Sequence, residues 1–221
     1  DAQDWSAALA ERGYKTTLLL DDKATKAAMV DAMGKLIAGG GKGDSLIITF
    51  SGHGTYQPDE DGDEVDGLDE ALCPYDLQTK GAALTDDEIK GIFATRKGGA
   101  RLLLISDSCH SGTVTRAAKA DKDADTRPRF MPMGNWLPAN RLPKNFAGKT
   151  VQTIVAPSGA SPLNAALDKQ VGDLLLAGCK EGPNNYSYDA KISGRYNGAF
   201  TYYALKTLKA LKPEATYADW Y

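Results

Sequence analysis

Uninterrupted hydrophobic runs are the clearest feature in the pattern of apolar and polar positions along the chain. The strongest are SLIITFS at residues 45–51 and ARLLLISD at residues 100–107. A continuous apolar run of this length is typical of a strand covered on both faces, as strands of parallel sheets are. The runs at residues 14–20 and 173–179 predict two further strands, and residues 152–157 predict a short one.

Helical segments alternate with these predicted strands. The pattern predicts four helices, at residues 2–12, 24–38, 85–96 and 198–211. Thr85 is suited to begin the third of them, because its hydroxyl can accept a hydrogen bond from an early helix N–H. Strands that alternate with helices predict an α/β fold, here a three-layer α/β/α sandwich with a mainly parallel central sheet.

Two segments lack such a pattern. Residues 54–82 are predicted to form a long polar loop, which holds eight carboxylates within residues 59–70. Residues 115–150 are rich in Pro, Arg and Lys with poor periodicity, so we expect an exposed insertion or linker. The chain is therefore predicted to consist of residues 1–114, this insertion, and residues 151–221, the first and last being two halves of one domain.

Two predicted strands end in turns that carry reactive side chains. The run at residues 45–51 leads into His53, and the run at residues 100–107 leads into Cys109. In an open parallel sheet both carboxyl ends lie at one edge, where ligands and substrates bind. A nearby histidine can take the proton of a thiol, and the thiolate attacks carbonyl carbons. A single Cys is more often a small core residue, but the paired placement favours a catalytic role.

Composition and charge narrow the functional classes. The 221 residues are 42% hydrophobic and 25% charged, as in an ordinary globular domain, and the net charge of −3 argues against a nucleic-acid partner. No apolar run reaches the length of about 18 residues that a membrane span needs. Three widely spaced cysteines form neither a disulfide framework nor a CxxC metal motif. We therefore expect a cytoplasmic monomer without membrane contact.

Two motifs carry a resemblance to a known family. SGHG at residues 51–54, followed by DSCHSG at residues 107–112, closely resembles the metacaspases, which are caspase-like cysteine peptidases. Further similar segments cover most of the chain: GLDEALCPYD (67–76), LTDDEI (84–89), DLLLAGC (173–179) and GAFTYYAL (198–205). The resemblance implies a caspase-like fold, with residues 1–114 as the large-subunit-like half and residues 151–221 as the small-subunit-like half.

The resemblance implies a role for each residue of the two motifs. Cys109 would be the nucleophile and His53 the general base and acid, while the backbone N–H groups of Gly54 and Cys109 would form the oxyanion hole. Asp107, Ser51 and Asp1 match the positions of a pocket for Arg or Lys, which carboxylates bind through charge-assisted hydrogen bonds. The implied function is a cysteine endopeptidase that cleaves protein or peptide substrates after Arg or Lys.

The resemblance also bears on metal binding. No cofactor is required for the implied chemistry, but several metacaspases need Ca²⁺ through acids that match Asp69, Asp86 and Asp87 here. Carboxylate oxygens are suitable calcium ligands. The alternative is a solvated acidic loop, and Asp86 and Asp87 also suit the first turn of a helix on electrostatic grounds. The acidic residues 59–70 do not have the spacing of an EF-hand.

Two further expectations follow from the resemblance. Arg116, Lys119 and Lys122 lie in the predicted insertion and would suit the basic pocket, so self-cleavage there would separate the two halves; an uncut tether is the alternative. The first strand of the family should precede Asp1, and we expect it upstream of this sequence.

Three other functional classes compete with the peptidase. A catalytically silent caspase-like scaffold or regulatory binding module would need neither Cys109 nor His53, although both are present with Asp107. A metal-binding protein would use the acidic loop and leave Cys109 incidental. A small-molecule α/β enzyme is disfavoured, because the sequence has no Gly-rich phosphate-binding loop.

Overall fold

The computed structural model describes residues 1–64, 67–109, 126–143, 167, 172–179, 187–212 and 214–220. Its α-helices are α1 (Ala2–Ala10), α2 (Lys26–Gly39), α3 (Leu77–Lys80), α4 (Asp86–Ala94), α7 (Ala199–Ala210) and α8 (Tyr217–Trp220). Its strands are β1 (Ser45–Ser51), β2 (Gly54–Pro58), β3 (Leu68–Leu72), β4 (Leu84–Thr85), β5 (Arg101–Asp107), β6 (Thr126–Pro128), β7 (Leu174–Ala177), β8 (Tyr188–Ile192) and β9 (Arg195–Gly198). Short 3-10 helices are η1 (Asp21–Lys23), η2 (Met133–Asn135) and η3 (Ala139–Arg141).

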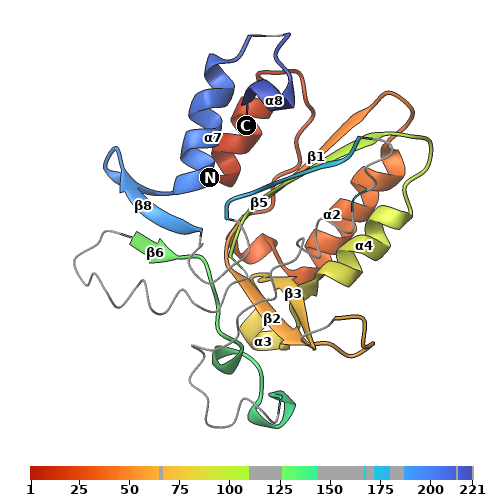
Figure 1. Ribbon diagram of the computed structural model, residues 1–221, viewed down its shortest axis with the longest axis vertical. Helices are drawn as coiled ribbons and strands as arrows, with labels where there is room; N and C mark the ends of the chain where they lie inside the picture. Colours follow the sequence, from red (N-terminus) through yellow and green to blue (C-terminus); the bar gives the residue numbers. More distant parts are fainter. Residues whose placement is uncertain are drawn as a thin grey trace.

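The central sheet is built from the three strongest apolar runs. Its order is β1-β5-β7 and both pairings are parallel. Successive side chains of a strand point to opposite faces, so the continuous apolar runs supply both faces at once. The parallel sheet predicted from these runs is confirmed, and Figure 1 shows it running through the middle of the molecule.

Helices α2 and α4 cover one face of this sheet (Figure 1). Their buried side chains pack against alternate residues of β1 and β5: Met29, Met33, Ile37, Ile89 and Phe93 against Leu46, Ile48, Leu102 and Leu104. Burying one such side chain stabilises the fold by about 1.5–3 kcal/mol. This layer holds the amino-terminal half of the molecule together.

Helices α1 and α7 cover the opposite face. Trp5 of α1 and Leu205 of α7 pack against Leu103 and Ile105 of β5, and the indole N–H of Trp5 donates to the Thr201 hydroxyl at 3.4 Å. The two ends of the chain therefore meet on one side of the sheet, as Figure 1 shows. The predicted three-layer α/β/α sandwich is confirmed.

A second sheet corrects the prediction of a long polar loop at residues 54–82. Strands β2, β3 and β4 form an antiparallel sheet, and helix α3 follows β3. All five residues of β3 are buried, including Asp69 and Glu70. The acidic composition concealed this strand, because charged residues are seldom fully buried.

The strand predicted at residues 14–20 is not formed. The segment has no strand assignment and no pairing with the described strands, and Leu18 is 41% exposed. An apolar run favours burial, but a strand also needs a neighbour for its backbone hydrogen bonds. The short strand predicted at residues 152–157 lies outside the described residues.

The described part of the predicted insertion packs against the domain. Residues 126–143 contain β6, which joins β8 and β9 in a third, antiparallel sheet. Met133, Trp136 and Leu137 are buried against the second sheet. The expectation of an exposed segment is wrong for these three residues, which are too irregularly spaced to predict an element, whereas residues 126–127, 134–135 and 138–141 are exposed.

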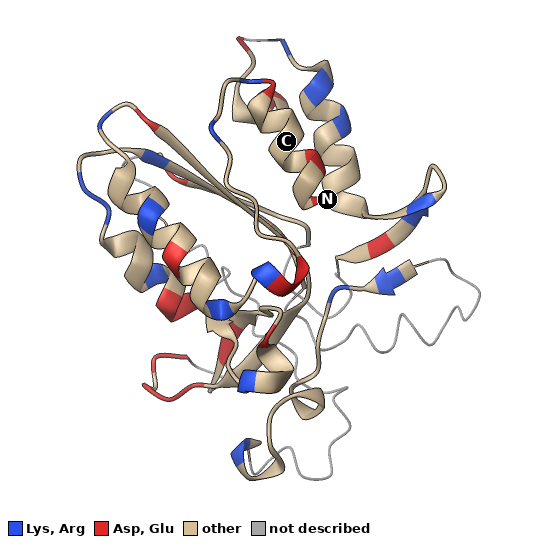
Figure 2. Ribbon diagram, turned by 180° about the vertical axis from the view of Figure 1, so that it is seen from behind, with Lys and Arg blue, Asp and Glu red and all other residues tan. Residues whose placement is uncertain are grey.

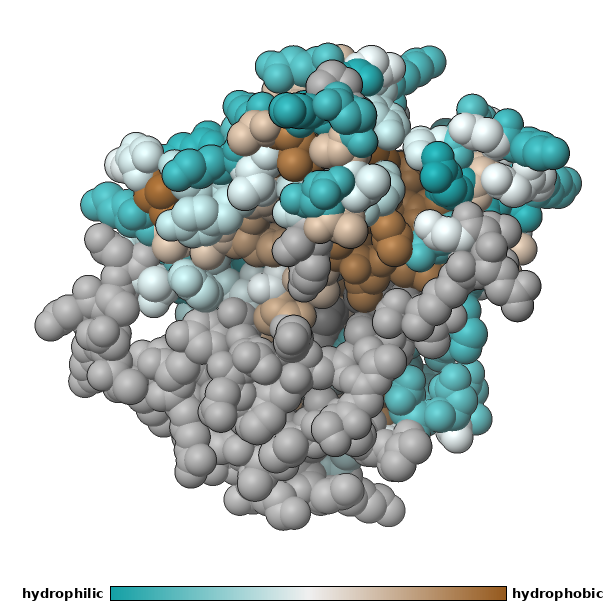
Figure 3. Space-filling model, turned by 45° about the horizontal axis from the view of Figure 1, so that its top comes forward, coloured by the Kyte–Doolittle hydropathy of each residue, from teal (hydrophilic) through white to brown (hydrophobic). Residues whose placement is uncertain are grey.

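Lys, Arg, Asp and Glu are spread over the outward faces of the helices (Figure 2), and a band of hydrophobic residues lies at the centre of the face drawn in Figure 3. Among the described helices, none combines the length and the hydropathy that crossing a membrane would require.

Candidate active site

Register in the central sheet brings the two motifs together. Ser51, the last residue of β1, pairs with Asp107, the last residue of β5, and Gly52 N donates to Asp107 O at 3.3 Å. His53 and Cys109 each follow two residues later, at the same sheet edge. Rigid strands thus fix where both turns begin.

Cys109 is fully buried and has a second thiol beside it. Cys179 follows the end of β7 and donates to Ser108 O at 3.5 Å. The pKa of Cys179 is raised, chiefly by its hydrogen bond to Cys109 and also by burial. Cys179 therefore stays protonated and acts as a donor. The sequence analysis did not predict that Cys179 lies beside Cys109. The apolar run at residues 173–179 nevertheless ends at the same sheet edge as the runs that lead into His53 and Cys109.

His53 faces solvent on one side and Arg129 on the other. Desolvation lowers the pKa of His53, the Arg129 charge lowers it further, and Asp189 opposes both effects. A neutral imidazole at neutral pH is able to accept a proton.

One backbone carbonyl occupies the space between the two motifs. The carbonyl oxygen of Arg129 accepts hydrogen bonds from Gly54 N at 3.0 Å and from Cys109 N at 3.1 Å. The His53 side chain also hydrogen-bonds the Arg129 backbone. Two fixed N–H groups aimed at one carbonyl oxygen are the arrangement that stabilises a developing oxyanion.

The Arg129 side chain is 5% exposed and surrounded by acidic groups. Its guanidinium pairs with the carboxylate of Asp1 and, at 2.7 Å, with that of Asp189. It also donates to Ser51 Oγ at 2.5 Å and to Asp107 O at 2.9 Å, with Asp107 Oδ2 at 3.4 Å. We call Asp1, Ser51, Asp107 and Asp189 the arginine pocket. The structure brings together around Arg129 the first three, which the resemblance matched to a pocket for Arg or Lys, and it adds Asp189 and Arg129 itself, which the sequence analysis did not name.

Asp107 lies at the base of the arginine pocket and is fully buried. Its carboxylate accepts from the Ser187 hydroxyl, from Thr201 N at 3.0 Å and from Thr201 Oγ1 at 2.6 Å. A buried carboxylate is tolerated only with such partners. These hydrogen bonds hold the negative charge in place for a cation.

Two glycines give the pocket its space. A Cβ added at Gly198 would clash with Asp107 Oδ2 and lie 2.7 Å from Arg129 Cζ, and one added at Gly178 would lie 2.8 Å from Asp107 Oδ1. The backbone at Gly198 has φ −58° and ψ 123°, which any residue can adopt. Gly198 is therefore required for room and not for its backbone conformation.

The three candidate metal ligands lie in β3 and in the first turn of α4. Asp69 of β3 and Asp86 of α4 are buried, and one carboxylate oxygen of each lacks a hydrogen-bond partner among the described residues. Burial, with neighbouring carboxylates, raises the pKa of Asp69 to about 6 and that of Asp86 to about 7. Asp87 is partly exposed and lies 3.7 Å from Lys90 Nζ. Such partnerless oxygens suit a cation.

The exposed acidic loop adds negative charge nearby. Carboxylate oxygens of Asp59, Asp61 and Asp63 lie within 4.8 Å of one another, and the loop stands out in red in Figure 2. Asp59 accepts from the backbone N–H groups of Gly62 at 2.7 Å and Glu64 at 3.0 Å. These bonds shape the loop without requiring a metal.

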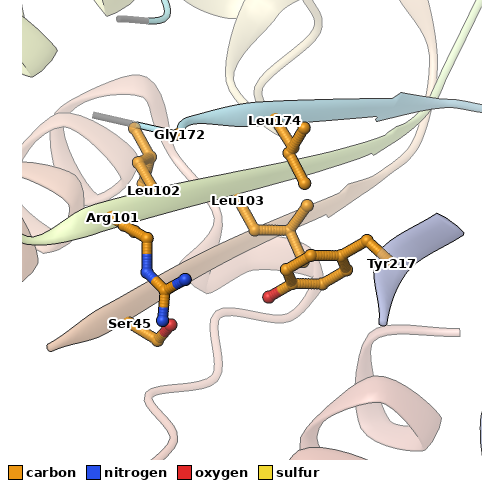
Figure 4. Close-up of a pocket in the computed structure, with 7 residues that line it drawn as sticks. All are labelled: Ser45, Arg101, Leu102, Leu103, Gly172, Leu174 and Tyr217. Carbon is orange, nitrogen blue, oxygen red and sulfur yellow. The ribbon is translucent and has the colours of Figure 1, made fainter. Parts of the chain in front are cut away.

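Two other features lie outside this arrangement. Arg116, Lys119 and Lys122, the predicted self-cleavage positions, are outside the described residues. A shallow pocket lined by Ser45, Arg101 and Tyr217 (Figure 4) lies at the amino ends of β1 and β5. It is at the opposite end of the sheet from Ser51 and Asp107 and takes no part in the site.

The chain is similar to known proteins over most of its length. It is 42% identical to metacaspase-1B of Aspergillus oryzae over 98% of this chain and 57% of that protein. It is 31% identical to metacaspase-3 of Arabidopsis thaliana over 90% of this chain and 50% of that protein. The chain thus spans about half the length of these curated relatives.

A solved structure has the same fold. The crystal structure of protein GSU0716 from Geobacter sulfurreducens superposes with a TM-score of 0.67 at 32% identity, covering 99% of this chain and 74% of that one. The family model described as the metacaspase, peptidase C14 domain matches residues 3–118, which include both motifs. The sheet edge with His53 and Cys109 thus lies within the matched residues, and the chain belongs to the metacaspase family of C14 peptidase domains.

Proposed function

We propose that the protein is a cysteine endopeptidase that cleaves after Arg or Lys through Cys109 and His53. One observation carries the proposal: the carbonyl oxygen of Arg129 receives the N–H groups of Gly54 and Cys109 while its guanidinium fills the arginine pocket. A residue held at both ends in this way supports the proposal that the arginine pocket binds the residue before a cleaved bond.

The reaction requires only groups of this chain and water. His53 takes the proton of Cys109, and the thiolate attacks the carbonyl carbon next to the bound side chain. The Gly54 and Cys109 N–H groups stabilise the negative oxygen that forms, and His53 returns the proton to the leaving amine. Water then hydrolyses the thioester and regenerates the thiol.

The charge of the pocket supports basic specificity. Asp1, Asp107 and Asp189 place three carboxylates around one cation. A planar guanidinium donates several hydrogen bonds to such a cluster, and a Lys ammonium satisfies the charge with fewer. An Asp side chain would be repelled, so its peptides are poor substrates.

The decisive experiment compares two fluorogenic peptides that differ only in Arg or Asp before the cleaved bond. We expect the Arg peptide to be hydrolysed at least about 30-fold more efficiently, since mispairing a buried charge costs about 2–5 kcal/mol. A Lys peptide should fall between them. Binding of the Arg peptide without any hydrolysis, after self-cleavage has been checked by mass, would instead support the silent scaffold.

The proposal also covers the oligomeric state and the cellular compartment of the protein. We propose a monomer in a reducing compartment such as the cytoplasm, acting on protein or peptide substrates. The described part of one chain supplies every group named in the mechanism. Cys73, Cys109 and Cys179 are all free thiols, which fits a reducing environment.

Calcium binding is a further part of the proposal. Asp69, Asp86 and Asp87 would hold the ion, because the first two have buried oxygens without partners among the described residues and pKa values raised chiefly by burial and further by nearby carboxylates, including that of Asp87. A bound Ca²⁺ would neutralise these charges and thereby tie β3 to α4. Helix α4 is positioned there by a capping box, in which Thr85 Oγ1 accepts from Glu88 N and Glu88 accepts from Thr85 N.

The free energy of unfolding should depend on pH because of the buried carboxylates at Asp69 and Asp86. Asp86 has an ordinary value of 3.8 and a folded pKa of about 7, so the folded state binds its proton more tightly than the unfolded chain. Metal-free stability should therefore fall as pH rises from about 4 to about 7. Asp86→Asn should raise the metal-free Tm at pH 8 and weaken the stabilisation by CaCl₂, measured by calorimetry.

A matched control separates this site from the acidic loop. Asp63→Asn removes an exposed carboxylate of that loop, and its protein should respond to CaCl₂ as the wild type does. An equal calcium response in the Asp86→Asn protein would exclude Asp86 as a ligand.

Self-processing within residues 115–150 completes the proposal. Arg116, Lys119 and Lys122 are basic and so suit the arginine pocket, which is why each is a candidate for the cleaved position. Cleavage in this segment would separate the two halves of the domain.

A further inference from the structure

The chain crosses its own active site as an extended peptide. Strand β6 pairs antiparallel with β8, with Thr126 opposite Ala190 and Pro128 opposite Tyr188. The next residue, Arg129, donates its N–H to Ser187 O at 3.0 Å. The residues that precede Arg129 are thus held by strand addition, a common mode of peptide recognition.

The residues after Arg129 are held as well. Phe130 forms a parallel bridge with Gly54, and Met131 N donates to Gly54 O at 2.8 Å. The Phe130 ring lies edge-on to Tyr56 with centroids 6.1 Å apart, beside Leu68. Both sides of the Arg129–Phe130 peptide bond are therefore fixed, with its carbonyl oxygen on the Gly54 and Cys109 N–H groups.

We infer that Arg129–Phe130 is a bond that this protein cuts in itself, and that residues 126–131 block the site until it is cut. The inference rests on the proposed function, whose chemistry it needs. Phe130 permits cleavage after Arg129, whereas Pro128 disfavours cleavage after Arg127. Arg129 was not among the positions suggested by the sequence, and it is the one whose carbonyl the structure places on the N–H pair.

The step balances with water as the co-reactant. The Cys109 thiolate forms a thioester with the Arg129 carbonyl carbon, and the bond to Phe130 N breaks. His53 transfers the thiol proton to the Phe130 amine. Water then cleaves the thioester, leaving a carboxylate on Arg129, an amine on Phe130 and the free thiol of Cys109.

Attachment to the same chain explains why the segment blocks the site. A tethered peptide competes at a high effective concentration, so an added substrate must displace it. Cutting the bond removes the tether on one side of the site and places a carboxylate where the neutral peptide bond had been. Hydrolysis of an added Arg peptide should therefore start with a lag that follows the cutting.

Intact-mass spectrometry of the purified full chain, in CaCl₂ and in EDTA, tests the inference. We expect fragments 1–129 and 130–221 to form with time, together with activity on a fluorogenic Arg peptide. Arg129→Lys should still be cut at this bond and Arg129→Gln should not. The matched control is Arg141→Gln, which removes an exposed arginine 3.4 Å from Glu60 and should be cut as the wild type is.

The outcomes separate this inference from the proposed function. Arg129→Gln also removes the guanidinium that anchors the blocking segment in the arginine pocket. Lag-free hydrolysis of the peptide by this uncut protein would therefore support both the bond and the block. Peptide hydrolysis by wild type without a fragment that begins at Phe130 would overturn the inference and leave the peptidase intact. No hydrolysis of peptide or chain would overturn both. Circular dichroism shows whether Arg129→Gln folds. If it does not, cutting of the Arg129→Lys protein between residues 129 and 130 would support the inference, and a folded Arg129→Lys protein that is not cut there would overturn it.

Discussion

Cys109→Ala should lower kcat/KM for an Arg peptide by about 10⁴-fold or more, the loss usual when a catalytic nucleophile is removed. The thiol is the group that would form the thioester, and the backbone N–H of the same residue is one of the two that hold the Arg129 carbonyl oxygen. The measurement is steady-state hydrolysis, and the same variant should show no fragment that begins at Phe130.

Cys73→Ala is the matched control for loss of a thiol. Burial raises the pKa of Cys73 to about 12, so this thiol is inert at neutral pH. Its side chain packs in the cluster with Trp136, and the variant should keep its activity while losing some stability. After the Arg129–Phe130 bond has been cut, iodoacetamide should label Cys109 in preference to Cys73. A Cys109→Ala protein as active as Cys73→Ala would rule out Cys109 as the nucleophile.

Asp107→Asn should lower kcat/KM for the Arg peptide by about 30-fold to several thousand-fold. The carboxylate is buried, and losing one partner of a buried ion pair costs about 2–5 kcal/mol. The neutral amide also offers N–H donors where Thr201 and Ser187 already donate. Steady-state kinetics with Arg and Asp peptides should show that the preference for Arg shrinks.

A second variant tests the pocket without removing its charge. Gly198→Ala places a methyl group 2.7 Å from the guanidinium carbon and against the Asp107 carboxylate, so it should reduce Arg hydrolysis although the carboxylate is still present. The control is Asp31→Asn, which removes an exposed carboxylate paired with Lys35 at 2.7 Å and should change nothing. If Asp107→Asn and Gly198→Ala both fold and keep the full preference for Arg, the arginine pocket does not set the specificity.

The central sheet and the pairing of the two motifs could be predicted from the sequence. Strands β1 and β5 carry mainly apolar residues on both faces. This pattern is typical of a parallel strand that is covered on both sides. Parallel register then places residues that follow the two strands at one edge. That is why His53 and Cys109 could be paired before any coordinates were known.

Other parts of the molecule depend on contacts that local patterns do not encode. Residues 14–20 have the composition of a strand but lack a paired neighbour among the described strands. Strand β3 carries buried acids, which look like a solvated loop in sequence. Arg129 belongs to a segment without periodicity, and only its contacts with Gly54, Cys109 and the arginine pocket distinguish it from other basic residues of that segment.

The ladder between β6 and β8 has a consequence for the proteins that such an enzyme would cut. Each residue of β6 lies opposite a residue of β8 and is fully extended. An arginine within a stable helix cannot adopt this conformation unless the helix unwinds locally. Folded targets would therefore be clipped at a few exposed loops and their helices spared, so that proteolysis by this domain would be limited and would yield large, stable fragments.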